Sequence, residues 1–269
     1  MIDLVKAKQA FAQYVASYDT SIPSIRLKII HTYEVVKCSQ YLCEQLHLSK
    51  EDQDLASLIA LLHDIGRFEQ WVKYQSFADF KTIDHALFSS ELLFKDGLIR
   101  EFIVDDQYDF IIQNAIEQHN KYQIDMGFDE RTLLFIHLIR DADKLDNFRV
   151  KEEEKIENIL YVSLDDINHE TISQEVFDQM YHQHVVYAPY RKTHLDMWLS
   201  YIAFIYDLYF FESIQYIRKH HWIDRSFDRL NPVDQDTNKQ YQLLKQRAIQ
   251  FINRGDELWD IKKQEKLYT

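Results

Sequence analysis

The chain has 269 residues, enough for one large domain or two small ones with a sizeable core. Its four glycines and three prolines disfavour loop-rich and all-β architectures, and its hydrophobic residues, 46% of the total, recur mostly at helical spacing. The formal net charge of −13 argues against a nucleic-acid backbone or an anionic membrane as the main partner. A small phosphorylated ligand is compatible with this charge, because local cations and a metal can reverse the field inside a pocket.

Helical patterns dominate the first 150 residues. Helices are predicted over residues 2–18, 23–46, 55–64, 85–96, 107–120 and 130–147. Pro23 suits the first turn of its helix, Asp84 can cap another, and Gly127 separates the last two. The helix over 55–64 is apolar nearly all round and is therefore expected at the centre. Residues 67–82 are rich in aromatic side chains and are expected to form an irregular or lid-like connection.

The helical pattern is weaker beyond the last of these helices. Residues 151–155 are highly charged and indicate a solvated helix start or a linker, and residues 197–216 form a strongly aromatic helical region. The tail from Asp234 is polar and helical and ends in lysine-rich sequence. We predict one helical domain over residues 1–150 and a helical extension over residues 151–269, which packs on the first domain and does not fold independently.

The cysteines and the apolar segments favour a cytoplasmic protein. Cys38 and Cys43 lie at i and i+5 in one predicted helix and point apart, so they form neither a zinc pattern nor an easy disulfide. The first residues lack the plan of a signal peptide. The most apolar segment, 197–211, is interrupted by Asp207 and is too short to span a bilayer comfortably, so no membrane partner is expected.

Several polar residues lie where these helices should be buried. His31 is in helical register with Val35 and Leu42, and the pair His63-Asp64 closes an apolar run. His85, His119 and Asp143 lie on the apolar faces of their own predicted helices. A buried histidine or carboxylate costs free energy unless something compensates it, and a divalent metal centre satisfies all of these residues at once.

Taken singly, each of these residues also has an ordinary explanation. A lone histidine on an apolar face is more often a hydrogen-bonded core residue than a ligand, and we interpret His137 in that way. An aspartate within a helix can pair with Arg140 or Lys144. The coincidence of several inward-facing ligands with a His-Asp dipeptide favours the metal centre. Mixed imidazole and carboxylate ligands suit a first-row ion better than Ca²⁺ or a structural zinc.

The order of these residues resembles a known family. His31, the pair His63-Asp64 and Asp143 follow one another as in the HD superfamily of metal-dependent phosphohydrolases, and the segment 142–147 is similar to the family's terminal Ala-Asp motif. His85 and His119, which are additional to that set, resemble members with two metals, such as dinucleoside polyphosphate hydrolases and the cyclic-dinucleotide branch. The resemblance covers residues 20–150 and implies an all-α HD-domain helical bundle with an α-helical C-terminal extension.

The resemblance also implies a ligand set. One ion would be bound by His31, His63, Asp64 and Asp143, and a second by His85 and His119, with Asp64 bridging the two. The cofactor is then a divalent transition metal, two ions per chain, with Fe or Mn ahead of Co, Ni, Zn or Mg. Asp141 and Asp146 are expected to pair with the ligands or orient them instead of binding metal.

The chemistry implied by such a site is hydrolysis. A metal-activated hydroxide would attack a small phosphate ester or nucleotide, with Asp64, Arg67 and Lys144 as catalytic residues. Lys121, Arg191 and Lys192 are further cations, and surface roles are favoured for Lys121 and Lys192. Members that act on nucleotide pyrophosphate bonds or 5′-nucleotides often carry an acidic residue where this chain has Arg67, which puts those substrates in doubt. The Gly-Tyr-Pro signature of the cyclic-dinucleotide branch is missing after His119, so a cyclic dinucleotide is not expected.

Two other classes of function remain open. A di-iron oxygenase can use the same cage of ligands, and a non-catalytic ligand-binding HD module can retain the cage for stability. The sequence also leaves open whether the protein is a homodimer and what residues 151–269 do. The aromatic part of that extension suits either a cover for the pocket or an oligomer interface.

Overall fold

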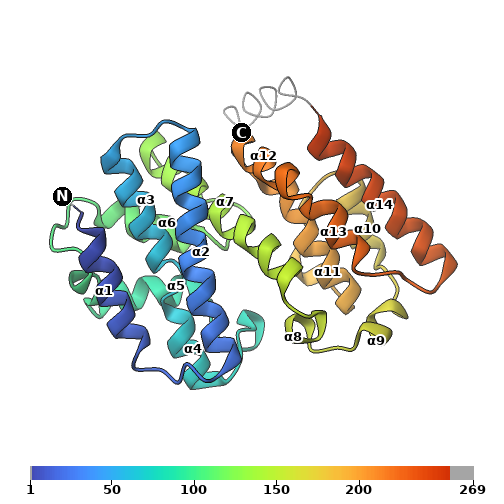
Figure 1. Cartoon of the computed structure of the whole chain (residues 1–269), viewed down its shortest axis with the longest axis horizontal. Coiled ribbons are helices and arrows are strands. Elements are labelled where there is room, and N and C mark those ends of the chain that lie inside the picture. Colours follow the sequence, from blue (N-terminus) through green and yellow to red (C-terminus); the bar gives the residue numbers. More distant parts are fainter. Residues whose placement is uncertain (1, 255–269) are drawn as a thin grey trace. The chain divides into compact units, whose positions relative to one another are not determined.

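A computed structural model describes residues 2–254, and the described chain contains helices and loops but no strand (Figure 1). The prediction of an all-α fold is therefore confirmed. The chain divides into two compact units, Met1–Asp146 and Asn147–Thr269. Within the described residues, no helix has both the length and the hydropathy that a bilayer span requires.

The first unit contains the helices α1 to α6 and the beginning of α7. Their bounds are α1 Leu4–Val15, α2 Pro23–Gln45, α3 Lys50–Leu62, α4 Gly66–Tyr74, α5 His85–Ser90, α6 Asp109–Gln118 and α7 Glu130–Glu153. A π-helical turn, Glu91–Lys95, continues α5. Most of the predicted helices are thus confirmed, with Pro23 in the first turn of α2 and Asp84 accepting hydrogen bonds from backbone N–H groups at the start of α5.

Helix α3 lies at the centre of this unit, as its sequence predicts. Its run Leu55–Leu62 is buried at every position, and α3 packs along α2. The side chain of Ser49 caps its first turn, where Glu51 and Asp52 complement the positive end of the helix dipole. A helix that is apolar all round can only be stable when neighbours cover every face.

Helices α4 and α5 approach each other closely because of a glycine. The backbone N–H of Gly66 donates to Ser89 Oγ at 2.9 Å. A Cβ atom at Gly66 would lie 2.8 Å from Ser89 N and 2.9 Å from Ser89 Oγ, which is shorter than real contacts allow. The absence of a side chain therefore lets the start of α4 contact α5, whose first residue is His85.

The prediction of an irregular connection over residues 67–82 is wrong for its first part. Gly66–Tyr74 is a regular helix, α4, in which Gly66 and Gln70, four residues apart, are buried on one face and Phe68 is also buried. Only the following residues form a loop, which contains the single 3₁₀ turn Asp79–Lys81.

The second unit differs more from the prediction. Its helices are α8 Ile156–Leu160, α9 Leu164–Asn168, α10 Gln174–Tyr181, α11 His194–Ile202, α12 Phe211–His220, α13 Trp222–Asp228 and α14 Gln235–Asn253. The short helices α8 to α10 and α13 were not predicted. The aromatic region 197–216 is not one helix, since a 3₁₀ segment, Ala203–Asp207, separates α11 from α12.

The first and last described segments of this unit were also predicted from the sequence. Of the charged residues 151–155, the first three end α7 and the last two connect it to α8, so only these two are a linker and no helix starts at residue 151. The helical tail is confirmed as α14, whose first turn is capped by Asp234. The lysine-rich end of the tail lies outside the described residues.

The close contact at Gly66 generates a stability prediction. We expect Gly66→Ala to lower the free energy of unfolding by about 1–3 kcal/mol, because the added Cβ overpacks the contact with the Ser89 backbone. Chemical denaturation followed by circular dichroism measures this loss. Ser89→Ala adds no volume but removes both hydrogen bonds of the Ser89 hydroxyl, which accepts from the Gly66 N–H and donates to the His85 carbonyl, so it should cost about 1–3 kcal/mol. Equal unfolding energies for Gly66→Ala and the wild type would contradict the packing argument.

Candidate metal centre

The six predicted ligands come together in the first unit from five helices and their ends. His31 lies in α2, His63 caps the C-terminus of α3 and Asp64 follows it; His85 begins α5, His119 caps the C-terminus of α6 and Asp143 lies in α7. The four histidines and Asp64 are at most 6% exposed. Two groups of potential ligands share Asp64, and the ligand atoms within each group lie within 4.8 Å of one another: His31, His63 and Asp64, and Asp64, His85 and His119.

The carboxylate of Asp64 lies between two pairs of imidazoles. Its Oδ2 atom is 3.8 Å from His31 Nε2 and 3.7 Å from His63 Nε2. Its Oδ1 atom is 3.3 Å from His85 Nε2 and 3.8 Å from His119 Nε2. Each oxygen therefore faces a different pair, which is the arrangement that a carboxylate needs to bridge two ions.

Asp143 adds a second carboxylate to the first pair. Its Oδ1 atom is 3.0 Å from His31 Nε2 and 3.9 Å from His63 Nε2. The structure thus groups His31, His63, Asp143 and one oxygen of Asp64 on one side. Its neighbour Asp141 is fully buried within α7.

Every histidine of the cluster is oriented through its Nδ1 atom. His63 Nδ1 is 2.8 Å from the Ala60 carbonyl oxygen, and His119 Nδ1 is 2.7 Å from the Ile116 carbonyl oxygen. A carbonyl oxygen only accepts, so each of these Nδ1 atoms carries the proton and each Nε2 atom presents a lone pair.

Carboxylates orient the other two imidazoles in the same way. His31 Nδ1 is 2.6 Å from Asp146 Oδ2, and His85 Nδ1 is 2.5 Å from Asp79 Oδ2. A carboxylate that accepts from Nδ1 fixes the ring and makes Nε2 a better ligand for a metal. Asp146 takes the orienting position expected from the sequence, whereas Asp79 was not foreseen.

The cluster contains buried hydrogen-bond acceptors that have no donor. Such unpaired lone pairs are what a bound cation would satisfy. His63 Nε2 and Asp64 Oδ1 are buried and have no hydrogen-bond partner among the described residues. His85 Nε2 and His119 Nε2 are only 3.1 Å apart. Each unsatisfied buried acceptor costs about 1–3 kcal/mol. A cation between these lone pairs removes the cost, and the nitrogen and oxygen ligands suit a first-row divalent metal.

The protonation states also suit metal binding. Burial alone would raise the pKa of the Asp64 carboxyl, but Lys28, His63, His85 and Arg67 outweigh it and hold that pKa well below its usual value. The carboxylate that bridges the two histidine pairs is therefore ionised.

Three of the remaining ligands, His63, His119 and Asp143, also hold the protonation state that binds a metal. Burial is the main cause that lowers the pKa of His63, and together with His85 and His63 it lowers the pKa of His119 to about 3, so both rings are neutral. For Asp143, burial is outweighed by His31, His63 and His119, and its pKa falls below the usual value. Burial and Lys28 lower the pKa of His31, but its contacts with Asp143 and Asp146 raise it overall.

Lys28 is a functional candidate that the sequence analysis missed. Its Nζ atom donates to Asp64 Oδ2 at 2.8 Å, and its side chain is 20% exposed. The sequence could have indicated its role, because Lys28 lies three residues before His31 and therefore on the same face of α2. Asp79 lies in the loop after α4, and no spacing pattern in the sequence could have predicted its contact with the cluster.

The predicted catalytic cations lie in different settings. Arg67 Nε is 3.6 Å from Asp64 Oδ1, and its NH1 atom donates to Gln70 Oε1 at 2.7 Å, the Phe77 carbonyl at 2.9 Å and Asp79 Oδ1 at 2.7 Å. This guanidinium ties the loop after α4 to the rim of the cluster. Lys144 is buried in α7, and its Nζ atom donates to the Arg140 carbonyl at 3.3 Å.

The other cations of the sequence analysis bind surface carboxylates or backbone. Lys121 Nζ is 2.5 Å from Asp125 Oδ2, and Lys192 Nζ is 2.8 Å from Glu175 Oε1. Arg191 Nε donates to the Ala188 carbonyl at 3.1 Å. These contacts agree with the surface roles favoured for Lys121 and Lys192.

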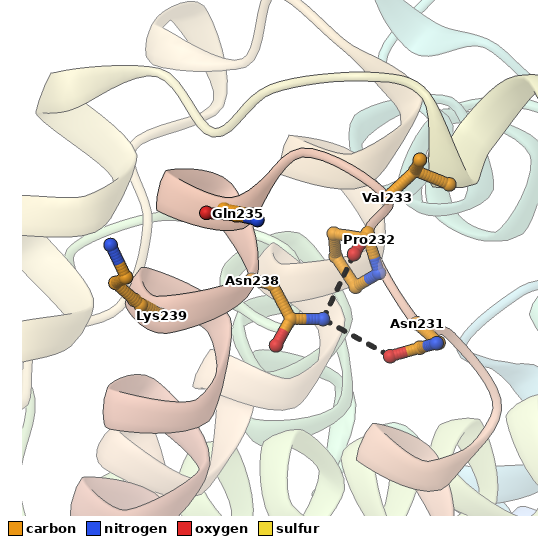
Figure 2. A pocket seen from close by; sticks show the side chains of 6 residues that line it. All are labelled: Asn231, Pro232, Val233, Gln235, Asn238 and Lys239. Carbon is orange, nitrogen blue, oxygen red and sulfur yellow. Dashed lines mark hydrogen bonds between the residues drawn. The ribbon is translucent and has the colours of Figure 1, made fainter.

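An open depression of about 500 Å³ lies in the second unit at the start of α14 (Figure 2). It is lined by Asn231, Pro232, Val233, Gln235, Asn238 and Lys239. The Asn238 amide donates to the Asn231 side chain at 3.0 Å and to the Pro232 carbonyl at 2.8 Å. Because its lining holds no histidine and no carboxylate, this depression has none of the metal-binding chemistry of the cluster.

The orienting role of Asp79 generates a prediction about metal affinity. If the cluster holds two ions, as expected from the sequence, Asp79→Asn should weaken binding of the ion at His85 and His119 by about 10–100-fold, because the neutral amide no longer fixes the His85 ring or raises its basicity. The ion on the His31 side should bind almost as before. Titration calorimetry with Mn²⁺ on metal-free protein distinguishes the two binding steps. Asp105→Asn, in an exposed loop, serves as the control, and an equal loss at both steps would contradict the assignment.

Comparison with known proteins agrees with this geometry. The family described as HD domain matches residues 29–148. No curated protein and no solved structure matches the chain. The matched segment contains all six residues of the cluster, from His31 to Asp143. Residues 29–148, somewhat less than half of the chain, therefore form an HD domain.

Proposed function

We propose that this protein is a metal-dependent phosphohydrolase that acts on a small phosphate ester or nucleotide. The observation that carries the proposal is the position of Asp64, whose two carboxylate oxygens face separate pairs of imidazole Nε2 atoms. The HD superfamily consists largely of metal-dependent phosphohydrolases, which supports the same class of reaction.

In this proposal the residues of the cluster hold two divalent ions. His31, His63 and Asp143 bind one ion together with Asp64 Oδ2, and His85 and His119 bind the other together with Asp64 Oδ1. When bound, such ions lower the pKa of a coordinated water from about 15.7 towards 7 and neutralise charge on a phosphoryl group. Fe and Mn are the first choices for this mixed donor set.

The surrounding residues position the ligands and compensate charge. Asp146 and Asp79 hold the rings of His31 and His85, so each Nε2 lone pair stays directed into the cluster. Arg67, beside Asp64 Oδ1, and Lys144, next to Asp143 in the chain, are proposed to stabilise negative charge that develops on the substrate. In a protein with a net charge of −13, an anionic substrate needs such local cations.

The reaction is proposed to take place in the cytoplasm. Cys38 and Cys43 are both buried and neither forms a disulfide, which is typical of a reducing compartment. A small phosphorylated molecule is the proposed partner.

Metal content is the first test of this proposal. We expect elemental analysis of protein purified without chelator or added metal to find about two transition-metal ions per chain, because two sets of ligands share one carboxylate. The double variant His63→Ala/Asp64→Ala should lose both ions, and the exposed His169→Ala should retain them. One ion per chain would restrict the centre to a single set of ligands, and no metal uptake on titration would refute the catalytic proposal.

Activity is the second test. Metal-loaded protein should hydrolyse members of a panel of phosphate monoesters and nucleotides, with release of inorganic phosphate as the measurement. His119→Ala should lower kcat by at least about 100-fold, because it removes a ligand of the second ion. Consumption of dioxygen by the iron-loaded protein, without phosphate release from any ester, would instead support the oxygenase alternative.

A further inference from the structure

Lys28 donates a hydrogen bond to an oxygen atom that a bound metal ion would also use. Its Nζ atom lies 2.8 Å from Asp64 Oδ2, the same oxygen that faces the Nε2 atoms of His31 and His63 at 3.8 and 3.7 Å. The ammonium group therefore neutralises the carboxylate oxygen that the first metal ion would share. Among the residues that the structure describes, no other side chain donates a hydrogen bond to the Asp64 carboxylate.

The two cations beside Asp64 differ in how firmly they are held. The guanidinium of Arg67 makes three hydrogen bonds through NH1, to a side-chain amide, a backbone carbonyl and a carboxylate. The Nζ atom of Lys28 makes one hydrogen bond, on a flexible and partly exposed side chain. Both cations lie 5.7 Å from the ring centroid of Phe77, in the loop after α4. Lys28 can therefore leave its partner more easily than Arg67 can.

We propose that Lys28 is an exchangeable counter-ion, which neutralises Asp64 before the metals bind and transfers to a phosphoryl oxygen of the substrate once they have bound. The inference rests on the metal centre of the proposed function and adds a specificity residue to it. A carboxylate that bridges two divalent ions needs no ammonium partner, and two like charges beside one oxygen repel each other. The displaced Nζ atom stays tethered to α2, three residues from His31, and would pair with an anion bound at the metals.

The first test compares metal affinity and stability in Lys28→Met and the wild type. The variant should bind Mn²⁺ about tenfold more tightly, because its metal-free form has lost a hydrogen bond between charged groups and no cation has to be displaced. Its melting temperature should be lower than that of the wild type in chelator, and equal or higher in saturating Mn²⁺. This reversal is the specific signature, since a side chain with only a structural role lowers the melting temperature under both conditions.

The second test uses inorganic phosphate as the probe for the second half of the exchange. Titration calorimetry on Mn²⁺-loaded protein should show about tenfold weaker phosphate binding in Lys28→Met, and Lys28→Arg should restore most of the affinity because it retains the charge. Lys37→Met is the matched control on the same helix. Lys37 pairs with Glu34 at the surface, so its loss should change neither metal nor phosphate affinity.

The inference is overturned by equal Mn²⁺ affinity in the variant and the wild type, by a lower melting temperature with and without metal, or by unchanged phosphate affinity. None of these measurements requires turnover. A protein that shows the exchange but hydrolyses no phosphate ester would refute the proposed function and leave the role of Lys28 intact.

Discussion

The first unit is organised around one buried carboxylate. Asp64 is 3% exposed and ionised, and an uncompensated charge in a protein interior costs several kcal/mol. The structure compensates it with positive and polar groups from five helices: Lys28 from α2, Arg67 from α4, and imidazoles at the ends of α3, α5 and α6. These helices have to converge on one carboxylate, so they must pack closely. The glycine at position 66 permits this close packing, because a side chain there would clash with Ser89 of α5.

Helix ends supply much of the rigidity of this site. His63 and His119 both cap helices, and each ring is held through Nδ1 by the carbonyl three residues earlier. Arg140 strengthens the second of these ends by donating to the carbonyls of Gln118, His119 and Lys121. The imidazoles are thus fixed by the backbone before any ion arrives, so that binding a metal requires little reorganisation.

The charge distribution is compatible with the anionic substrate that we propose for this acidic protein. The net charge of −13 repels phosphates at long range, whereas the rim of the cluster carries Lys28 and Arg67 beside Phe77. Screening at physiological ionic strength limits the long-range term to about 8 Å, but partly buried charges at the rim keep their effect. Asp79, in the loop after α4, contacts both Arg67 and His85, so this loop links the Arg67 guanidinium to the histidine cluster.

The sequence by itself determined the fold class and the identity of the cluster. Helical periodicity requires no knowledge of long-range contacts, and a histidine or aspartate on an apolar stripe must enter the core, so His31, His85, His119 and Asp143 could be named before the structure. The pair His63-Asp64 was found in the same way, at the end of an apolar run.

Only the tertiary structure decided which atoms meet. It showed that Asp64 directs one oxygen to each pair of imidazoles, that Lys28 holds one of those oxygens, and that Asp79 reaches His85 from a loop. It also divided the aromatic region of the second unit into α11 and α12. These features depend on packing between segments distant in sequence and on loop paths without a repeating pattern, whereas periodicity reports only on the faces of single helices.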